Sequence, residues 1–450
     1  MAKSKQKFIC QNCEAVFYKW AGRCENCGEW NSLVEQTLPE MGRSAVARSI
    51  NNGKPLQVNL LNSIPFEEGM KRLKTGIGDL DIILGGGILP GGVTLLAGQP
   101  GIGKSTLLLQ TVANIAHNYD VLYVSGEESA GQVRLRAARL CADKSSNLNF
   151  AASTSADDIA ATIRTGKYHL VVVDSVQTLH LNEITSSPGS ISQITNSSNV
   201  IINAAKETGT SVIFVGHVTK EGSIAGPKIL EHLVDVVLQF EGDRYGGFKI
   251  VRAVKNRYGS TNEAAIFEMG EKGLRIVENP SAALLAERRD EDGSVVLATL
   301  EGARPLLVEI QALVNSTNFG YPKRTASGFD INRLNLLIAV LERRTKLKLS
   351  DKDIYINVVG GIKISDPAAD LAICMAIASA SAGRRLNYGT VVFGEVGLGG
   401  EVRSVTSIEK RIAEAKKLGF TKALAPRTGK NDFIIGVDNV RSTLIEYLQK

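Results

Sequence analysis

The sequence lacks any long apolar run, and outside one cluster it has few cysteines. Its longest strongly apolar stretch, Leu371 to Ala380, is far shorter than the ~20 residues that cross a bilayer. The first residues, MAKSKQK, contain no secretory apolar core, so we expect a cytoplasmic protein with no membrane partner. Hydrophobic residues at 44% and charged residues at 22% exclude the fibrous and disordered classes. A net charge of +6 permits nucleic-acid binding without arguing for it.

Four of the six cysteines form two Cys-x-x-Cys pairs near the start of the chain, Cys10 with Cys13 and Cys24 with Cys27. Two such pairs can direct four thiolates at one Zn²⁺, which leaves no position for a catalytic water. The alternatives are two disulfides or a redox pair. Disulfides are disfavoured without a secretion signal, and a redox pair needs no second copy. We therefore predict a structural zinc module over residues 1–35.

Alternating strand and helix patterns follow a polar stretch, residues 36–66, that we interpret as a linker. Such alternation predicts an α/β sheet of parallel strands covered on both faces, here over residues 67–280. The expected strands are Val93–Ala97, Val121–Ser125, Leu170–Asp174, Ser211–Gly216, Val234–Phe240 and Lys249–Val254. Residues 281–450 form another region of mixed strands and helices, with an amphipathic helix near Ser407–Leu418.

The most specific motif is a phosphate-binding loop between an expected strand and an expected helix. It fits GxxxxGK[ST] and comprises Gly98, Gln99, Pro100, Gly101, Ile102, Gly103, Lys104, Ser105 and Thr106. Backbone N–H groups of such a loop surround phosphate oxygens, and the helix N-terminus adds partial positive charge. Lys104 is expected to reach the β- and γ-phosphates, and Ser105 to bind Mg²⁺.

Acidic residues at the ends of two expected strands complete this site. Asp174 ends an apolar strand, as a Walker B residue that binds Mg²⁺ does, although buried strands also end in Asp at ordinary turns. Glu127 and Glu128 follow a strand beside the P-loop strand, where a γ-phosphate would project. We favour Glu127 as the base for the attacking water; the alternative is a solvated helix start. His217 is a further candidate to contact the γ-phosphate.

These motifs, together with Lys255-Asn256-Arg257-Tyr258-Gly259, resemble the bacterial RadA/Sms family of DNA-repair ATPases, which is distinct from the archaeal recombinase also called RadA. The match covers nearly the whole chain, and the pentapeptide is diagnostic of the family. The resemblance implies a RecA-like core that hydrolyses ATP and forms a hexameric ring on single-stranded DNA, as DnaB-type helicases do. It also implies that Lys255 and Arg257 reach the neighbouring subunit's nucleotide; spacing alone also allows two cations that face water.

In RecA-like cores, DNA binds to two loops, here about Thr178–Gln193 and Thr219–Lys228. The first loop has no lysine or arginine, and the second has Lys220 and Lys228. Long polar loops are usually only mobile connections, so DNA contact at these loops is implied by the resemblance alone.

The C-terminal part, from about Ser281, resembles the α+β proteolytic domain of Lon. The segments that resemble it are Arg324–Asp330, Asp366–Asp370 and Gly394–Val402. Lon uses a serine nucleophile and a lysine base, and these fall on Ala368 and Glu409. The neighbouring Lys410 is turned away by about 100° on a helix. We therefore expect a scaffold without peptidase activity.

The resemblance implies an ATP-dependent DNA motor, a helicase or branch-migration enzyme that acts with RecA in homologous recombination and repair. Its partners would be single-stranded and branched DNA, and it would associate with the nucleoid when active. The alternative is a non-motor accessory protein, switched by nucleotide, that binds DNA and RecA. Arg384, Arg385 and Arg403 are candidates for basic, DNA-facing surface on the C-terminal scaffold, or else solvated surface.

Overall fold

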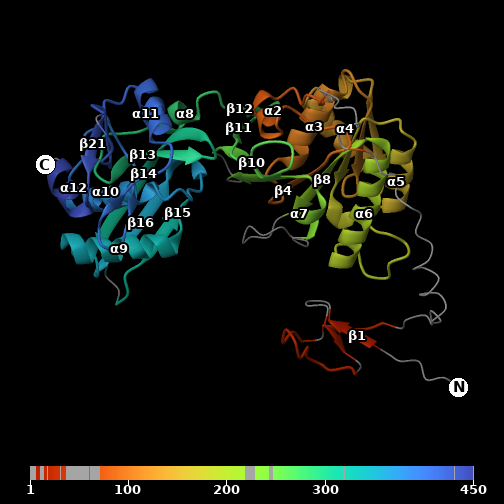
Figure 1. The fold of residues 1–450 in the computed structure, drawn as a ribbon, viewed down its shortest axis with the longest axis horizontal. Helices are drawn as coiled ribbons and strands as arrows, with labels where there is room; N and C mark the ends of the chain where they lie inside the picture. The colour runs from red at the N-terminus through yellow and green to blue at the C-terminus, as the bar shows by residue number, and fades with distance from the viewer. Residues whose placement is uncertain are drawn as a thin grey trace. The chain divides into compact units, whose positions relative to one another are not determined.

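The computed structural model describes residues 7–10, 15–17, 19–30, 32–36, 60, 71–217, 229–242, 247–317, 320–429 and 431–448. The chain forms two compact units, Met1–Glu68 and Gly69–Lys450 (Figure 1). Within the described ranges, no helix has the length and apolar character needed to cross a membrane.

The first unit contains a small antiparallel sheet in the order β2-β1-β3. Its strands are β1 (Lys7–Cys10), β2 (Val16–Phe17) and β3 (Leu33–Gln36). The core between them consists of little more than Cys10, Cys24 and Leu33, with Phe8 and Phe17 packed against it. So small a core does not stabilise a fold by burial alone, and units of this size usually need a metal or a disulfide.

The second unit begins with a nine-stranded sheet in the order β12-β11-β10-β9-β4-β8-β7-β5-β6. The strands are β4 (Val93–Gly98), β5 (Val121–Ser125), β6 (Leu148–Ala152), β7 (Leu170–Asp174), β8 (Ser211–His217), β9 (Val236–Gly242), β10 (Lys249–Asn256), β11 (Ala264–Gly270) and β12 (Gly273–Ile276). All six expected strands are confirmed. From β9 to β6 the strands are parallel.

One prediction about this sheet was wrong: β10 is antiparallel to β9, and so are the strands that follow. The reason is the length of the connection. Only residues 243–248 separate β9 from β10, whereas a parallel crossover needs a dozen residues or more.

Helices cover both faces of the nine-stranded sheet (Figure 1). They are α2 (Gly78–Ile83), α3 (Lys104–Ile115), α4 (Ala130–Arg139), α5 (Ala156–Arg164), α6 (Ile191–Thr208) and α7 (Ile229–Leu233), with the 3₁₀ turns η2 (Ala142–Lys144) and η3 (Val176–Thr178). Successive strand residues enter different cores: Leu96 packs with α3, and Leu95 packs with α5 and α6. The strands are therefore buried on both faces, which explains their continuous apolar sequences.

The C-terminal part is built on a seven-stranded sheet in the order β15-β16-β14-β13-β17-β20-β21. Its strands are β13 (Ser294–Glu301), β14 (Arg304–Ser316), β15 (Arg324–Ser327), β16 (Lys352–Val358), β17 (Thr390–Val392), β20 (Lys422–Pro426) and β21 (Ile434–Val437), beside the pair β18 (Glu395–Val396) and β19 (Val402–Arg403). The helices are α8 (Pro280–Leu285), α9 (Ile331–Thr345), α10 (Ala369–Ala382), α11 (Ile408–Lys417) and α12 (Val440–Tyr447), with the turn η4 (Val359–Gly361). The mixed sheet confirms the α+β prediction.

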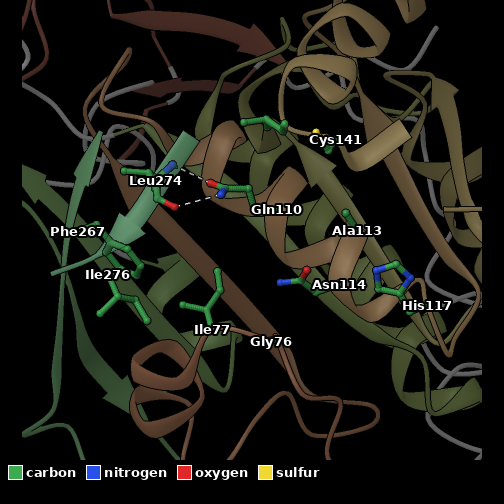
Figure 2. A pocket seen from close by; sticks show the side chains of 11 residues that line it. Gly76, Ile77, Gln110, Ala113, Asn114, His117, Cys141, Phe267, Leu274 and Ile276 are labelled. Atoms are coloured by element: carbon green, nitrogen blue, oxygen red, sulfur yellow. Dashed lines mark hydrogen bonds between the residues drawn. The ribbon is translucent and has the colours of Figure 1, made fainter. Parts of the chain in front are cut away.

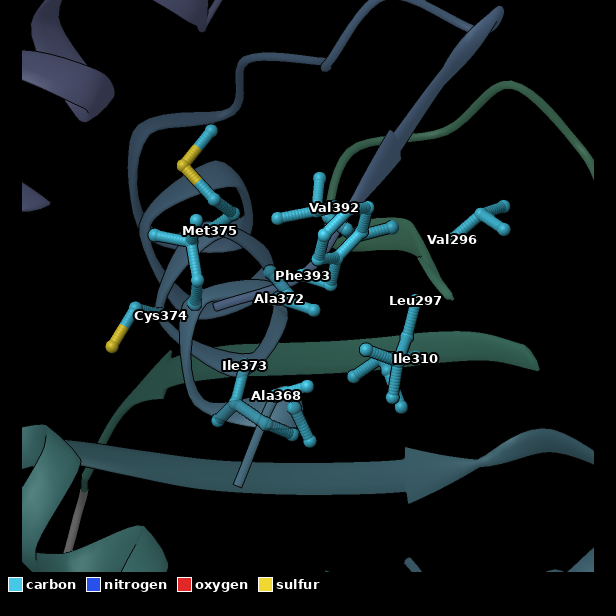
Figure 3. Close-up of a cluster of buried hydrophobic side chains, with 14 of the residues drawn as sticks. Val296, Leu297, Ile310, Ala368, Ala372, Ile373, Cys374, Met375, Val392 and Phe393 are labelled. Carbon is cyan, nitrogen blue, oxygen red and sulfur yellow. The ribbon is translucent and has the colours of Figure 1, made fainter. Parts of the chain in front are cut away.

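Helix α10 is the centre of the C-terminal core, and nearly all of its side chains are buried (Figure 3). Residues Ile250 and Ile266 of the β10–β11 hairpin belong to this core, whereas Val251 and Phe267 belong to the core under α3. The hairpin thus contributes one face to each core. The domain boundary near residue 280 stays a prediction.

Arg411 on α11 has no solvent-exposed surface, and its guanidinium donates to Asp366 and to the carbonyl of Ala298, both at 2.7 Å. Burial alone would raise the pKa of Asp366, but the hydrogen bond from Arg411 holds it below its usual value.

We expect Arg411→Ala to lower the free energy of unfolding by about 3–5 kcal/mol, because Asp366 would lose its buried counter-charge. Urea denaturation would measure this loss. Arg403→Ala removes an exposed ion pair with Glu401 and should change stability by less than about 1 kcal/mol; equal losses would contradict the prediction.

Candidate functional site

The P-loop connects β4 to α3 and depends on its glycines. At Gly98 a Cβ atom would come within 2.6 Å of the carbonyl oxygen of Phe240 on β9. Gly101 and Gly103 have φ angles of 77° and 117°, which L side chains rarely adopt. Helix α3 then begins at Lys104, so its free N–H groups face the concave side of the loop.

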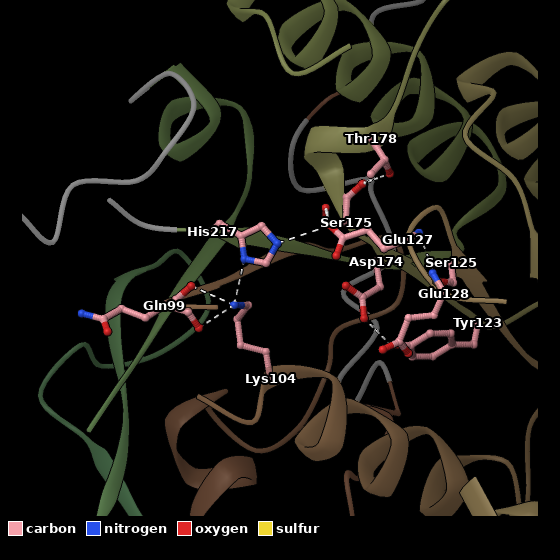
Figure 4. Close-up of polar contacts among 11 residues, drawn as sticks. Gln99, Lys104, Tyr123, Ser125, Glu127, Glu128, Asp174, Ser175, Thr178 and His217 are labelled. Carbon is pink, nitrogen blue, oxygen red and sulfur yellow. Dashed lines mark hydrogen bonds and ion pairs between the residues drawn. The ribbon is translucent and has the colours of Figure 1, made fainter. Parts of the chain in front are cut away.

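The Lys104 ammonium group is held inside this loop. It donates to the carbonyl oxygens of the first two loop residues at 2.8 and 3.0 Å and lies 3.1 Å from Nδ1 of His217 (Figure 4). Burial lowers the pKa of Lys104 to about 8, although the carboxylates of Asp174 and Glu127 act in the opposite direction. Lys104 is therefore a buried cation that faces two acids, an arrangement that attracts phosphate together with a divalent metal.

The structure separates the two adjacent glutamates that follow β5. Glu128 forms a two-point ion pair with Arg136 of α4, at 2.5 and 2.8 Å. Glu127 accepts a hydrogen bond from the Ser175 hydroxyl and lies 3.3 Å from Nε2 of His217 (Figure 4). The His217 hydrogen bond is the largest cause that lowers the pKa of Glu127, which falls to about 2. Glu127 is therefore ionised and lies beside His217 at the P-loop, whereas the Glu128 carboxylate is engaged by Arg136.

Asp174 ends β7 and is 8% exposed, with its carboxylate beside the P-loop (Figure 4). The hydroxyl of Tyr123, on the neighbouring strand β5, donates to it at 2.5 Å. Sequence reasoning missed Tyr123 and Ser175. A buried tyrosine in an otherwise aliphatic strand is a signal in itself, because its hydroxyl needs a partner, but the sequence does not identify that partner.

Lys255 and Arg257 lie away from the P-loop of their own chain. Strand β10 is antiparallel to β9, and β9 is parallel to β4, so β10 ends at the edge of the sheet where β4 begins. Lys255 donates to carbonyl oxygens of Glu231 and Val234 at 2.6 and 2.7 Å. Arg257 pairs with Asp235 at 3.2 Å and is 55% exposed. The structure thus brings Lys104, Glu127 and Asp174 together and leaves these two cations at the opposite edge.

The first expected DNA loop ends at a buried glutamine, Gln193. Gln193 is 2% exposed, and its side-chain amide bonds the backbone of Leu181, Ile184 and Ser186. This glutamine holds the loop's shape. The second expected loop, Thr219–Lys228 with Lys220 and Lys228, lies outside the described residues.

Three of the four predicted zinc ligands converge in the first unit. The Sγ atoms of Cys10, Cys24 and Cys27 all lie within 4.8 Å of one another. Cys13 lies outside the described residues. Three converging thiols over a minimal core suit a tetrahedral Zn²⁺ with thiolate ligands.

The two positions that sequence reasoning assigns to the protease dyad, Ala368 and Glu409, carry neither a serine nor a lysine. Ala368 is fully buried against the C-terminal core (Figure 3). Glu409 is exposed on α11, and Lys410 donates to the carbonyl oxygen of Ala303 at 3.3 Å.

Two of the three arginines suggested for DNA contact are in ion pairs, Arg385 with Asp290 and Arg403 with Glu401.

A pocket of about 240 Å³ lies beside the later turns of α3, next to Gln110 and Asn114. None of the predicted site residues lines it (Figure 2). In its wall, the side chain of Gln110 makes two hydrogen bonds with the backbone of Leu274, at 2.9 and 3.0 Å. These bonds attach β12 to the P-loop helix.

The sheet order, the P-loop after β4 and the acid at the end of β7 define a RecA-like P-loop ATPase. Family comparisons agree: residues 69–223 match the AAA domain, residues 8–35 the rubredoxin metal binding domain, and residues 334–429 the subunit ChlI of Mg-chelatase. A solved structure titled "Crystal structure of the RadB recombinase" is 23% identical, with a TM-score of 0.37, over 46% of this chain and 100% of its own.

Full-length relatives identify the family. "DNA repair protein RadA" of Bacillus subtilis is 47% identical, covering 99% of both chains. The Pseudomonas aeruginosa protein of the same name is 46% identical over 95% of this chain and 94% of its own, and that of Listeria monocytogenes is 44% identical over 99% of both. The chain belongs to the bacterial RadA family of DNA repair proteins, which confirms the resemblance, and it is an ATP hydrolase with a role in DNA repair.

Proposed function

We propose that this chain is an ATP-driven DNA motor, a helicase or branch-migration enzyme that works with RecA on single-stranded and branched DNA in the bacterial cytoplasm. The observation that supports this most is that the charged residues of the site lie at two opposite edges of the sheet. Lys104, Glu127 and Asp174 lie together at one edge of the sheet, whereas Lys255 and Arg257 lie at the other. A complete site then needs two subunits, as in a ring that couples hydrolysis to movement.

The P-loop residues Gly98 to Thr106 would bind the triphosphate through their N–H groups, with Lys104 on the β- and γ-phosphates. Ser105 and Asp174 would hold Mg²⁺, which supplies Lewis-acid stabilisation of phosphate charge. Glu127, ionised and fixed by Ser175 and His217, would orient the attacking water and take its proton. His217 contacts both Lys104 and Glu127, so it would detect whether a γ-phosphate is present.

Lys255 and Arg257 would supply positive charge to the nucleotide of the adjoining subunit. In a closed ring, a heterologous interface brings one edge of each sheet to the opposite edge of the next. Cations delivered in this way stabilise charge that develops on the γ-phosphoryl group. Hydrolysis would then depend on assembly, which we expect to be hexameric.

The test is ATP turnover and strand separation with and without single-stranded DNA. We expect DNA to stimulate turnover several-fold and a forked duplex to be unwound only with hydrolysable ATP. A nucleotide-switched accessory protein would instead bind DNA in an ATP-dependent manner, with no stimulation and no unwinding. That result would exclude the motor and support the alternative.

A further inference from the structure

The hydroxyl of Tyr123 contacts Asp174, one of the two residues that we assign to magnesium. It donates to Oδ2 of Asp174 at 2.5 Å. Tyr123 is only 2% exposed and lies on β5, next to β7. One buried side chain thus holds the carboxylate at the end of the Walker B strand.

The hydrogen bond from Tyr123 has a consequence for metal binding. Asp174 has one oxygen occupied by Tyr123, which fixes the carboxylate and orients its other oxygen. Outer-shell groups that orient metal ligands in this way typically change metal affinity by about 10- to 100-fold when they are removed.

We propose that Tyr123 is a positioning residue for Mg²⁺, which orients the Asp174 carboxylate toward the metal ion. This inference rests on the proposed function, because it uses the metal role assigned there to Asp174. The ring of Tyr123 packs in the core under α3 with Leu96 and Val172. Tyr123→Phe keeps that ring and removes only the hydroxyl, so it separates packing from positioning.

The experiment measures metal binding, with turnover as a secondary readout. A fluorescent ADP analogue is bound to the full chain, first in EDTA and then with increasing Mg²⁺; in parallel, bound Mn²⁺ is counted by electron paramagnetic resonance. Tyr123→Phe should bind the analogue normally in EDTA but require about tenfold more Mg²⁺ or Mn²⁺ for the metal-dependent increase. Tyr119→Phe, a tyrosine whose ring lies 5.1 Å from that of His169, is the matched control and should show no shift.

Each outcome decides the question. An unshifted metal titration in Tyr123→Phe would overturn the proposal, and so would a loss of nucleotide binding in EDTA with no further change on adding metal, because both indicate a packing role. Asp174→Asn tests the assumption that Asp174 binds Mg²⁺. If that variant keeps normal metal dependence, the proposed magnesium site is wrong. If Asp174→Asn loses metal and Tyr123→Phe does not, only the positioning role fails.

Discussion

Glu127→Gln is expected to lower kcat for ATP hydrolysis by about 10²- to 10⁴-fold, the range typical of a lost general base. Glu127 is ionised because His217 and Ser175 hydrogen-bond its carboxylate and hold its pKa at about 2. The amide is close in size but does not accept the proton of the attacking water. Nucleotide binding should be nearly unchanged, since Lys104 and the P-loop remain. Single-turnover hydrolysis together with equilibrium binding would separate the two effects.

The adjacent glutamate offers a matched control. Glu128 is of the same type and one position away, but its carboxylate is engaged by Arg136. Glu128→Gln should leave kcat within about threefold of the parent, because a partly exposed ion pair contributes little. A larger loss in Glu128→Gln than in Glu127→Gln would reverse the assignment.

Local sequence motifs predicted the strands and the P-loop of the ATPase core well, because each of these features is determined by residues that are adjacent in the sequence. The six apolar runs became strands, and the P-loop lies between β4 and α3 where the pattern predicts it. A strand that is buried on both faces has to be apolar throughout, and a loop that binds phosphate needs glycines at fixed positions. Both requirements concern only a few consecutive residues, so a short stretch of sequence is enough to recognise them.

Relations between distant segments were not predictable in the same way. The direction of β10 depends on a short connection, and the partner of Tyr123 depends on which strand adjoins β5. Gln193 was assigned to a DNA loop by its position, yet it is buried and holds that loop together. Polarity alone does not distinguish a ligand-facing amide from one that satisfies nearby backbone groups.

Arg257→Ala is expected to reduce hydrolysis by about 10³-fold or more, the effect of losing an arginine that acts in trans. Its own P-loop would be untouched, because Arg257 lies at the opposite edge of the sheet. Nucleotide binding by isolated subunits should therefore be normal. Arg257→Lys should recover only part of the activity, since lysine lacks the planar fork that contacts two phosphate oxygens.

Mixing two inactive variants tests the trans role directly. In a mixed ring, an Arg257→Ala subunit supplies an intact P-loop and Glu127, and a neighbouring Glu127→Gln subunit supplies an intact Arg257. About a quarter of the interfaces would then be complete when the subunits assemble at random, so activity should return to a similar fraction of the parent. Arg257 could instead act within its own chain, or only pair with Asp235 at 3.2 Å. In either case, the turnover of a mixture would not exceed the sum of the turnovers of the two variants measured separately. Turnover measured against mixing ratio distinguishes these cases, because complementation peaks at equal amounts and simple addition is linear.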